Sequence, residues 1–298
     1  MSEDSKPSLE SLVKSLAGVK FESADNVPVV QTPIVETRKP RVVIGTPCYG
    51  GMAYTNYFVS LMHTLKMMDA NGIDCYPIFI QGESLITRGR NNIVAKFLND
   101  PLATHLIFID ADIAWNPIDV LKLLQHNKDI VGGIYPMKTY KFENLDFKNL
   151  SDIIERNKGS LHNSIPTPEF IRQNLMKYNL NHKHAQFKVE KNLVEVKHIA
   201  NGFMMIKREV LEKMIEAHPE FKFWDDMGCL NKEEDRFAYT LFDCKVVDGH
   251  YFSEDWLFCH RWEEMGGSIY TDITINLTHI GTHHFQGRFL SSLNIKQN

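Results

Sequence analysis

The sequence predicts an α/β domain in which helices flank a mostly parallel sheet. Apolar runs of strand length alternate repeatedly with stretches of helical periodicity, and this kind of alternation implies parallel strands. Glycine, proline or aspartate follows several of the apolar runs and marks where those strands end. With 298 residues, 43% of them hydrophobic, the chain can fill the core of one large domain.

Residues 1–39 are expected to form a flexible arm. They hold few aromatic residues but several Ser, Glu, Lys and Pro, and at most one short helix around Leu9 to Leu16. A single domain, residues 40–298, is expected to follow, and its first strand begins near Arg41.

Strands and helices alternate through the first half of this domain. The pattern predicts a strand from Arg41 into a glycine-rich turn, a helix from Tyr54 to Met68, a strand over 75–81, a helix over 85–98, a strand over 104–110 and a helix from Asn116-Pro117 through Leu124. Asn116 and Pro117 suit the cap and the first turn of that last helix. A further apolar run, DIVGGIYP, follows at 129–136.

The second half is less regular. Residues 138–197 are rich in Lys and Asn and contain one amphipathic stretch, 170–178, so we interpret them as an insertion. Order returns with a strand and a helix over 198–217, and then with a helix from Ser253 that leads into a strand over 269–280.

Charge and cysteine content disfavour several classes of protein. A net charge of −4 provides no global basic field, so no nucleic-acid partner is expected. Five widely spaced cysteines without a CxxC pair suggest neither a disulfide framework nor a thiolate zinc site. The sequence contains no evident signal peptide and no apolar stretch long enough to span a membrane, so a cytoplasmic, reducing location is expected.

Two aspartates follow the apolar run THLIFI. Asp110 and Asp112 are two positions apart, so both side chains leave the strand on the same side and can converge on one divalent cation. Ligands of such sheets bind beyond the carboxyl ends of the strands, where a cation can bridge carboxylates and a diphosphate. A turn or helix-capping role is the competing interpretation of a bare DxD motif.

A histidine lies at the end of the last predicted strand. Alternation over IYTDITINLTHI places His279 on the same face as Ile275 and Leu277, so its imidazole is expected to point inward. It is either a hydrogen-bonded core residue or a further ligand of the cation. His283 and His284 follow closely and could substitute for it.

Two acids open the helix that starts at Ser253. Glu254 and Asp255 fall in its first turn, where the helix dipole stabilises carboxylates. Capping explains these residues adequately, and a general base toward an acceptor hydroxyl is the alternative.

An arginine interrupts an otherwise apolar helix face. Arg90 shares this face with Ile86, Ile93 and Phe97, so its guanidinium needs a buried or cleft anion. The anion is either a diphosphate or a structural group of the protein, and Arg88 and Asn91 are neighbours that could share the task.

The loop TPCYGG after the first strand could cradle a nucleotide. Gly50 and Gly51 permit close backbone approach, and Tyr49 could stack on a base. Met52-Ala53 replace the Lys-Ser/Thr pair of a P-loop, and GxGxxG is absent from this loop, so ATPase and dehydrogenase functions lose their main support.

Taken together, seven segments resemble glycosyltransferases of the GT-A fold, particularly small viral and bacterial ones: TPCYGG, RGRNNIVAKFL, THLIFIDADIAWNP, VGGIYPMK, NGFMMIKREV, SEDWLFCHRW and LTHIG. The resemblance spans about Arg41 to Gly281 except for the insertion. It implies a Rossmann-like, mixed, mostly parallel sheet flanked by helices. It also implies that a hexosyl or related group moves from a nucleoside diphosphate sugar, first of all a UDP-sugar, to a glycan, glycolipid or glycoprotein. For a viral chain, the expected location is the host cytoplasm.

The resemblance also implies roles for individual residues. Asp110 and Asp112 match the DxD motif that holds Mn²⁺ or Mg²⁺ against the donor, and His279 matches the late metal-binding histidine. Asp255, with Glu254 beside it, matches the acid that deprotonates the acceptor hydroxyl in inverting members. The remaining expected contacts are Thr46, Pro47 and Tyr49 at the nucleoside, Arg88, Arg90, Asn91 and Ala111 elsewhere on the donor, and Asn201, Gly202 and Phe203 on the acceptor side.

Two other functions fit the same residues. A nucleotide-sugar hydrolase or nucleotidyltransferase would use the same cation without an acceptor sugar. A non-catalytic carbohydrate-binding protein could keep the acidic loop as a calcium site.

Overall fold

A computed structural model describes residues 39–142, 147–158, 165–183, 188–281 and 285–292. These residues belong to one compact unit, Arg38–Asn298. The arm expected at the N-terminus, including its short helix, lies outside the described residues except for Lys39.

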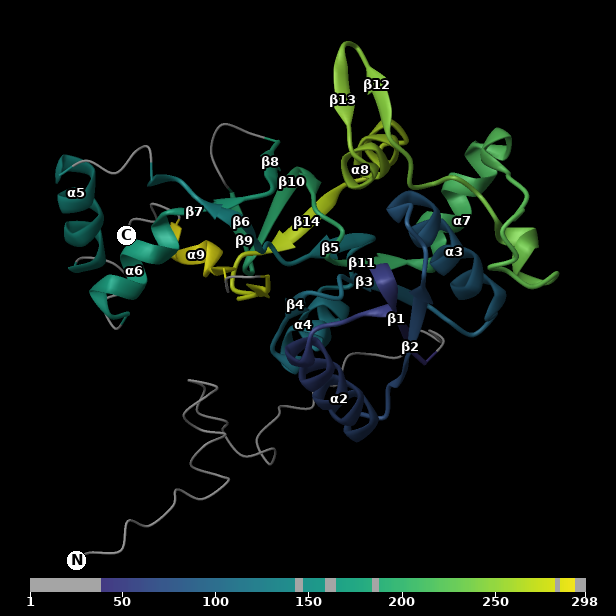
Figure 1. Cartoon of the computed structure of the whole chain (residues 1–298), viewed down its shortest axis with the longest axis horizontal. Coiled ribbons are helices and arrows are strands. Elements are labelled where there is room, and N and C mark those ends of the chain that lie inside the picture. The colour runs from purple at the N-terminus through teal and green to yellow at the C-terminus, as the bar shows by residue number, and fades with distance from the viewer. Residues whose placement is uncertain (1–38, 143–146, 159–164, 184–187, 282–284, 293–298) are drawn as a thin grey trace, which may run out of the picture. The chain divides into compact units, whose positions relative to one another are not determined.

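A mixed sheet forms the centre of this unit (Figure 1). Within the described residues it has nine strands in the order β2-β1-β3-β11-β5-β14-β10-β8, with β9 paired to β10. Their bounds are β1 Arg41–Cys48, β2 Asp74–Gln81, β3 His105–Ile109, β5 Ile130–Gly132, β8 Leu180–His182, β9 Val189–Glu190, β10 Leu193–Ile199, β11 Phe203–Lys207 and β14 Ile269–Asp272.

Most of these strands run in one direction. β1 is parallel to both β2 and β3, and β5 is parallel to β14. β11 is antiparallel to β3 and β5, and β10 is antiparallel to β14 and β8. The predicted fold class, an α/β fold with a mixed, mostly parallel sheet flanked by helices, is confirmed.

Helices cover both faces of the sheet. One face packs against α2 (Thr55–Ala70) and α4 (Pro117–His126). The other packs against α3 (Ile86–Asn99), α7 (Arg208–Ala217) and α8 (Glu254–Glu264), as Figure 1 shows. Apolar residues from both layers interlock with the strands, so the sheet is buried between helices as its apolar strand sequences require.

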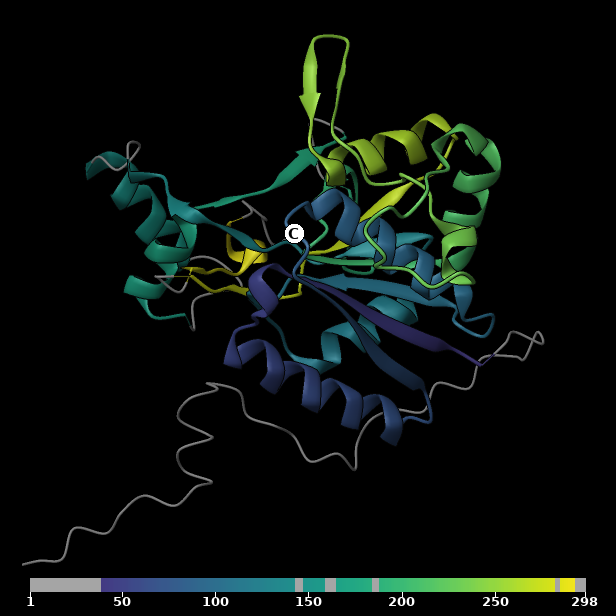
Figure 2. The same cartoon turned by 45° about the vertical axis from the view of Figure 1, so that its right-hand side comes forward.

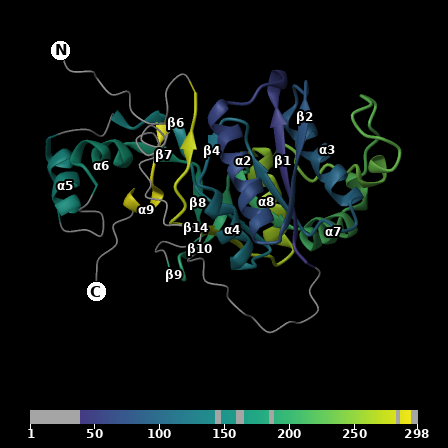
Figure 3. The same ribbon diagram turned by 90° about the horizontal axis from the view of Figure 1, so that it is seen from below.

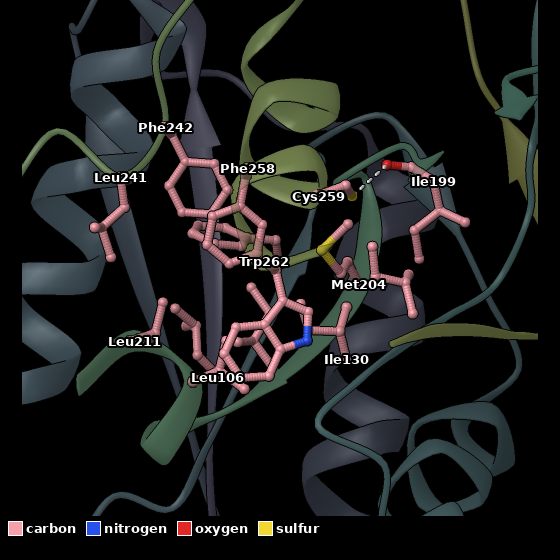
Figure 4. Packing of buried hydrophobic residues seen from close by; sticks show 14 of the residues in the cluster. Leu106, Ile130, Ile199, Met204, Leu211, Leu241, Phe242, Phe258, Cys259 and Trp262 are labelled. Atoms are coloured by element: carbon pink, nitrogen blue, oxygen red, sulfur yellow. Dashed lines mark hydrogen bonds between the residues drawn. The ribbon is translucent and has the colours of Figure 1, made fainter. Parts of the chain in front are cut away.

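The core beneath α8 fixes where that helix begins (Figure 4). Phe258 stacks on Phe242 with ring centroids 4.4 Å apart, and the Cys259 thiol donates to the Ile199 carbonyl at 3.8 Å. Trp262 packs in the same cluster. Burying each aromatic side chain contributes about 2 kcal/mol, so α8 is held firmly against the sheet.

Local patterning located the first elements to within a few residues. α2 was expected from Tyr54 to Met68 and spans Thr55–Ala70, and the Asn116 side chain accepts a hydrogen bond from the Ile118 amide at 3.2 Å, which confirms the predicted cap of α4. The prediction of one continuous strand over 269–280 is wrong. It breaks after Asp272, whose carboxylate accepts from the Thr274 amide at 2.8 Å and closes a turn.

The expected insertion contains more regular structure than its sequence suggested. Its strands β6 (Pro136–Tyr140) and β7 (Met176–Tyr178) pair with each other, and β10 starts within it. The helix expected over 170–178 is α6 (Thr167–Asn174), and the chain then becomes extended because β7 finds its partner in β6. α6 contacts α5 (Phe147–Lys158) and α9 (Phe289–Ser292), and Figure 3 shows the three together.

Smaller elements complete the unit. β15 (Thr278–His279) lies between β4 (Ile113–Ala114) and β16 (Phe285–Gln286). The hairpin of β12 (Lys245–Val247) and β13 (His250–Phe252) leads directly into α8 and protrudes above it in Figure 2. Short 3-10 turns occupy Tyr49–Gly51, Pro219–Phe221 and Glu234–Phe237. No helix in the described ranges combines the length and hydrophobicity needed to cross a bilayer.

Candidate functional site

The DxD residues lie where β3 and β11 meet. The last residue of β3, Ile109, pairs with Phe203, the first residue of β11. Beyond this pair the Asp110 amide donates to the Gly202 carbonyl at 3.1 Å, and the Asp110 carbonyl accepts from the Ile113 amide at 3.0 Å. The chain therefore turns at Asp110, at the carboxyl edge of the sheet, with the segment Asn201-Gly202 beside it.

Asp112 and His279 are brought together by the small sheet at this edge. β15 pairs His279 with Ile113, and the Ile280 amide donates to the Asp112 carbonyl at 2.8 Å. In this arrangement His279 Nε2 lies 3.3 Å from Asp112 Oδ2. The pair was expected from the sequence as two ligands of one cation, and the structure brings them within reach of each other.

The tautomer of His279 follows from its second contact. Its Nδ1 lies 2.9 Å from the Pro136 carbonyl, which can only accept, so Nδ1 carries a hydrogen. In the neutral ring, Nε2 then presents a lone pair toward the Asp112 carboxylate, and such a juxtaposition needs a proton or a cation between the two atoms. A carbonyl that orients the far nitrogen is the usual support of a metal-binding histidine.

A lysine already provides positive charge at this point. Lys138 Nζ lies 2.5 Å from Asp112 Oδ2, the same oxygen that His279 faces. Burial alone would raise the pKa of Asp112, but the neighbouring His279 and Lys138 outweigh it and hold that pKa below its usual value. The carboxylate is therefore ionised and available to a cation.

Asp110 turns toward a different partner. Arg90 Nη2 donates to Asp110 Oδ1 at 2.9 Å, and Arg90 Nε reaches Glu254 Oε1 at 3.3 Å. The guanidinium also lies 5.2 Å from the centre of the Phe108 ring. Burial would lower the pKa of Arg90, but Asp110 and Glu254 raise it above its ordinary value, so the arginine stays charged. Among the described residues, no group of three or more His, Cys, Asp or Glu side chains is placed so that it could hold a metal ion.

Asp255 is the most shielded acid of this region. It is 8% exposed, accepts a hydrogen bond from the Ser253 hydroxyl, and accepts one from the Trp256 amide at 2.8 Å. Burial, and next the neighbouring Glu254, raise the pKa of Asp255 above its ordinary value, although both hydrogen bonds oppose the shift. A carboxylate with a raised pKa is a better proton acceptor than an exposed aspartate.

Tyr135 is a member of this cluster that sequence reasoning missed. Its hydroxyl accepts from the Gly202 amide at 3.2 Å, and its ring meets the His279 ring edge-on, with centroids 5.2 Å apart. Burial, and then Asp110 and Asp255, raise its pKa well above the ordinary value for tyrosine. The sequence signal that could have identified Tyr135 is its position just after the VGGI run. This run contains β5, which ends at the same edge of the sheet as β3.

Gly202 is required for the close packing of these groups. A Cβ at this position would lie 2.5 Å from the Tyr135 hydroxyl and 2.7 Å from Asp110 Oδ2. A larger residue would thus displace either the tyrosine or the aspartate. The acceptor-side role expected for Gly202 stays a prediction. The position of Gly202 beside Asp110 holds whether or not it has that role.

The glycine loop expected at the nucleoside lies next to the DxD turn. The Ala111 carbonyl accepts from the Tyr54 amide at 3.0 Å and ties the two segments together. Tyr49 is 75% exposed and Pro47 is half-buried, so both remain available to a ligand. The Thr46 side chain is fully buried and its hydroxyl lies 2.5 Å from that of Tyr57, so only its backbone can serve a ligand.

Other expected contacts are occupied by the protein itself. The Asn91 side chain donates to the Phe242 carbonyl at 2.8 Å and accepts from the Phe242 amide at 2.9 Å. Arg88 pairs with Glu83 at 2.5 Å. Phe203 is fully buried and packs near Trp115. The donor and acceptor roles of these residues remain predictions, and their contacts within the protein do not add support for them.

Asn201 differs from them. It is 1% exposed, and neither end of its amide has a hydrogen-bond partner within the described part of the chain. Buried amides are normally paired, so this side chain can still serve a polar ligand. His283 and His284, considered as substitutes for His279, lie outside the described residues.

Comparisons with known proteins add little to this geometry. No protein-family model and no curated protein match the sequence. A solved structure titled A197 from STIV has 16% identity over 81% of this chain and 86% of its own, with a TM-score of 0.44. A glycosyltransferase involved in glycosylation of the major capsid of PBCV-1 has 13% identity over 63% of this chain and 71% of its own, with a TM-score of 0.25. Both TM-scores are low, so any functional assignment depends on the site itself.

Proposed function

We propose that this protein is a metal-dependent glycosyltransferase that moves a sugar from a nucleoside diphosphate sugar to an acceptor hydroxyl. The observation that carries the proposal is the meeting of Asp112 and His279 at 3.3 Å at the carboxyl edge of the sheet, two residues after Asp110, which pairs with the buried Arg90. Ligands of α/β sheets bind at this edge. A UDP-sugar donor and a glycan, glycolipid or glycoprotein acceptor are the first partners to test.

Asp112 and His279 are the residues that would hold Mn²⁺ or Mg²⁺, with Asp110 nearby. Carboxylate oxygens suit either ion, and the orientation of His279 by the Pro136 carbonyl suits a nitrogen ligand. A bound divalent ion would supply positive charge against the leaving diphosphate. The ion pair of Lys138 with Asp112 supports the proposal that positive charge is favourable at this carboxylate.

Arg90 contributes a fixed positive charge to the same region. Its Nη1 atom is buried without a hydrogen-bond partner in the described structure, although Nη2 and Nε pair with carboxylates. A guanidinium held in this way can stabilise charge that develops on a phosphate without first having to reorient. The arginine thereby favours the departure of a nucleoside diphosphate.

Asp255 is the proposed general base. Its raised pKa and its shielding suit proton removal from an acceptor hydroxyl as that oxygen attacks the anomeric carbon. Direct attack of this kind inverts the configuration at that carbon. Glu254, the neighbouring acid, is engaged with Arg90 and is therefore assigned to charge balance at the donor side.

Product analysis of the Asp112→Asn variant tests the proposal. The variant should fold normally and lose Mn²⁺-dependent turnover of a UDP-sugar, because the amide is a poor ligand for a hard cation. Assays with and without a glycan acceptor separate transfer from hydrolysis of the donor. Unchanged turnover in the variant would refute the metal role. Glycan binding without any turnover in Mn²⁺ would favour a carbohydrate-binding protein.

A further inference from the structure

Lys138 contacts the carboxylate that the proposed cation would need. Its Nζ atom lies 2.5 Å from Asp112 Oδ2, whereas the closest approach of His279 to that oxygen is 3.3 Å. The lysine side chain is 36% exposed, so burial does not lock it in place. A cation supplied by the chain itself thus sits at one of the two residues proposed to bind a metal.

The strand β6 delivers this lysine and orients the histidine at the same time. Pro136, at the start of β6, accepts the hydrogen bond from His279 Nδ1. Lys138 follows two positions later in the same strand, and its Nζ atom reaches Asp112 Oδ2. One short strand therefore sets the tautomer of one proposed ligand and neutralises the other.

We infer that Lys138 is the resident counter-ion of this site and competes with the divalent cation for Asp112. The inference rests on the proposed function only for the identity of the cation site. An ammonium group at 2.5 Å and a metal ion on the same oxygen would repel each other, so binding of the ion must displace the lysine. A long, half-exposed side chain can move into water at little cost, because exposed ion pairs contribute less than about 1 kcal/mol.

Lys138 also acts on the metal-free protein. Without a divalent ion, Lys138 balances the charge of Asp112 and keeps β6 beside the DxD turn. When an ion binds, the strand loses that anchor but keeps the bond from His279 to Pro136. Cation affinity is therefore set by the lysine as well as by the ligands themselves.

Direct Mn²⁺ titration of the full chain tests this inference without an activity assay. The free ion is followed by electron paramagnetic resonance in wild type, Lys138→Met, Lys138→Gln and Lys138→Arg. Loss of the ammonium should tighten Mn²⁺ binding by up to about fivefold in the Met and Gln variants, since the competitor is removed. The Arg variant keeps the competing charge and should bind Mn²⁺ like wild type.

Lys141→Met is the matched control, because Lys141 is an exposed lysine on the same segment. It should leave Mn²⁺ affinity unchanged, and circular dichroism checks that each variant is folded. Equal or weaker Mn²⁺ binding by both neutral variants would overturn the inference and leave the proposed function standing. A complete lack of Mn²⁺ binding in wild type and in every variant would instead remove the cation site and both proposals with it.

Discussion

Arg90 donates from Nη2 to Asp110 Oδ1 at 2.9 Å and joins the helix α3 to the end of β3. The same guanidinium reaches Glu254 at 3.3 Å, in the first turn of α8. Two successive elements, α3 and β3, and the distant helix α8 are thus held by one buried cation. In the proposed reaction this junction keeps the donor side and the base side of the site in a fixed relation.

The charge of Arg90 is expected to be needed for stability. Arg90→Met would leave Asp110 and Glu254 without their shared partner, at a cost of about 3 kcal/mol because the pair is largely buried. Urea denaturation measures the loss. Arg236→Met is the control, since Arg236 pairs with Glu233 on the surface and should cost less than about 1 kcal/mol. Equal losses in both variants would contradict the assigned role.

The two acids of α8 are expected to differ in their effects on catalysis. Asp255→Asn should lower kcat for sugar transfer about 10² to 10⁴-fold while donor binding persists, because only the proton acceptor is removed. Glu254→Gln should act mainly through Arg90 and reduce kcat far less. Steady-state kinetics with donor binding by calorimetry separates the two. Similar mild reductions of kcat in both variants would favour the alternative interpretation, in which both acids only cap the helix.

The pH profile should report the environment of Asp255. A base must be deprotonated, so transfer should rise with pH through the pKa of Asp255, which lies above its ordinary value. The Ser253 hydroxyl bonds to the carboxylate and lowers that pKa, so Ser253→Ala should move the acid limb to higher pH. Ser268→Ala, which removes a hydroxyl bonded to Glu195, should leave the profile in place. A shift to lower pH in Ser253→Ala would contradict this account.

Asn91 offers a test between a structural and a donor-binding role. Both hydrogen bonds of its side chain go to the Phe242 backbone, so Asn91→Ala should cost about 1 to 3 kcal/mol of stability and leave the donor KM unchanged. Asn71→Ala, which removes an exposed bond to Met67, should cost less. A raised donor KM with undiminished stability would restore the role expected from the sequence.

The layered fold was predictable because its signals are local. The apolar periodicity of α2 and α3 and the cap of α4 at Asn116 depend on residues close in sequence. The break after Asp272 was not visible, because Ile273, Ile275 and Leu277 are all buried and keep the alternating pattern of a strand. The turn is revealed by the hydrogen bonds of the Asp272 side chain to the amide and hydroxyl of Thr274.

The sequence predicts which residue types form the site better than it predicts which side chains contact each other. Asp112 and His279 were expected to meet, and they do. The bond of Arg90 to Glu254, 164 residues away, was not foreseen, because contacts of that separation leave no local periodicity. Lys138 and Tyr135 escaped notice for the same reason, since their importance lies in where β5 and β6 place them.

The proposed function requires Asp112 and His279 to hold a divalent ion that binds the diphosphate of a sugar donor. Anomalous diffraction from crystals soaked in Mn²⁺ and UDP tests it most directly. We expect a manganese peak about 2.0 to 2.6 Å from an Asp112 oxygen and close to His279 Nε2, with diphosphate oxygens on the ion and Lys138 moved away. A map with UDP bound, no peak at this position and Lys138 still on Asp112 would contradict it.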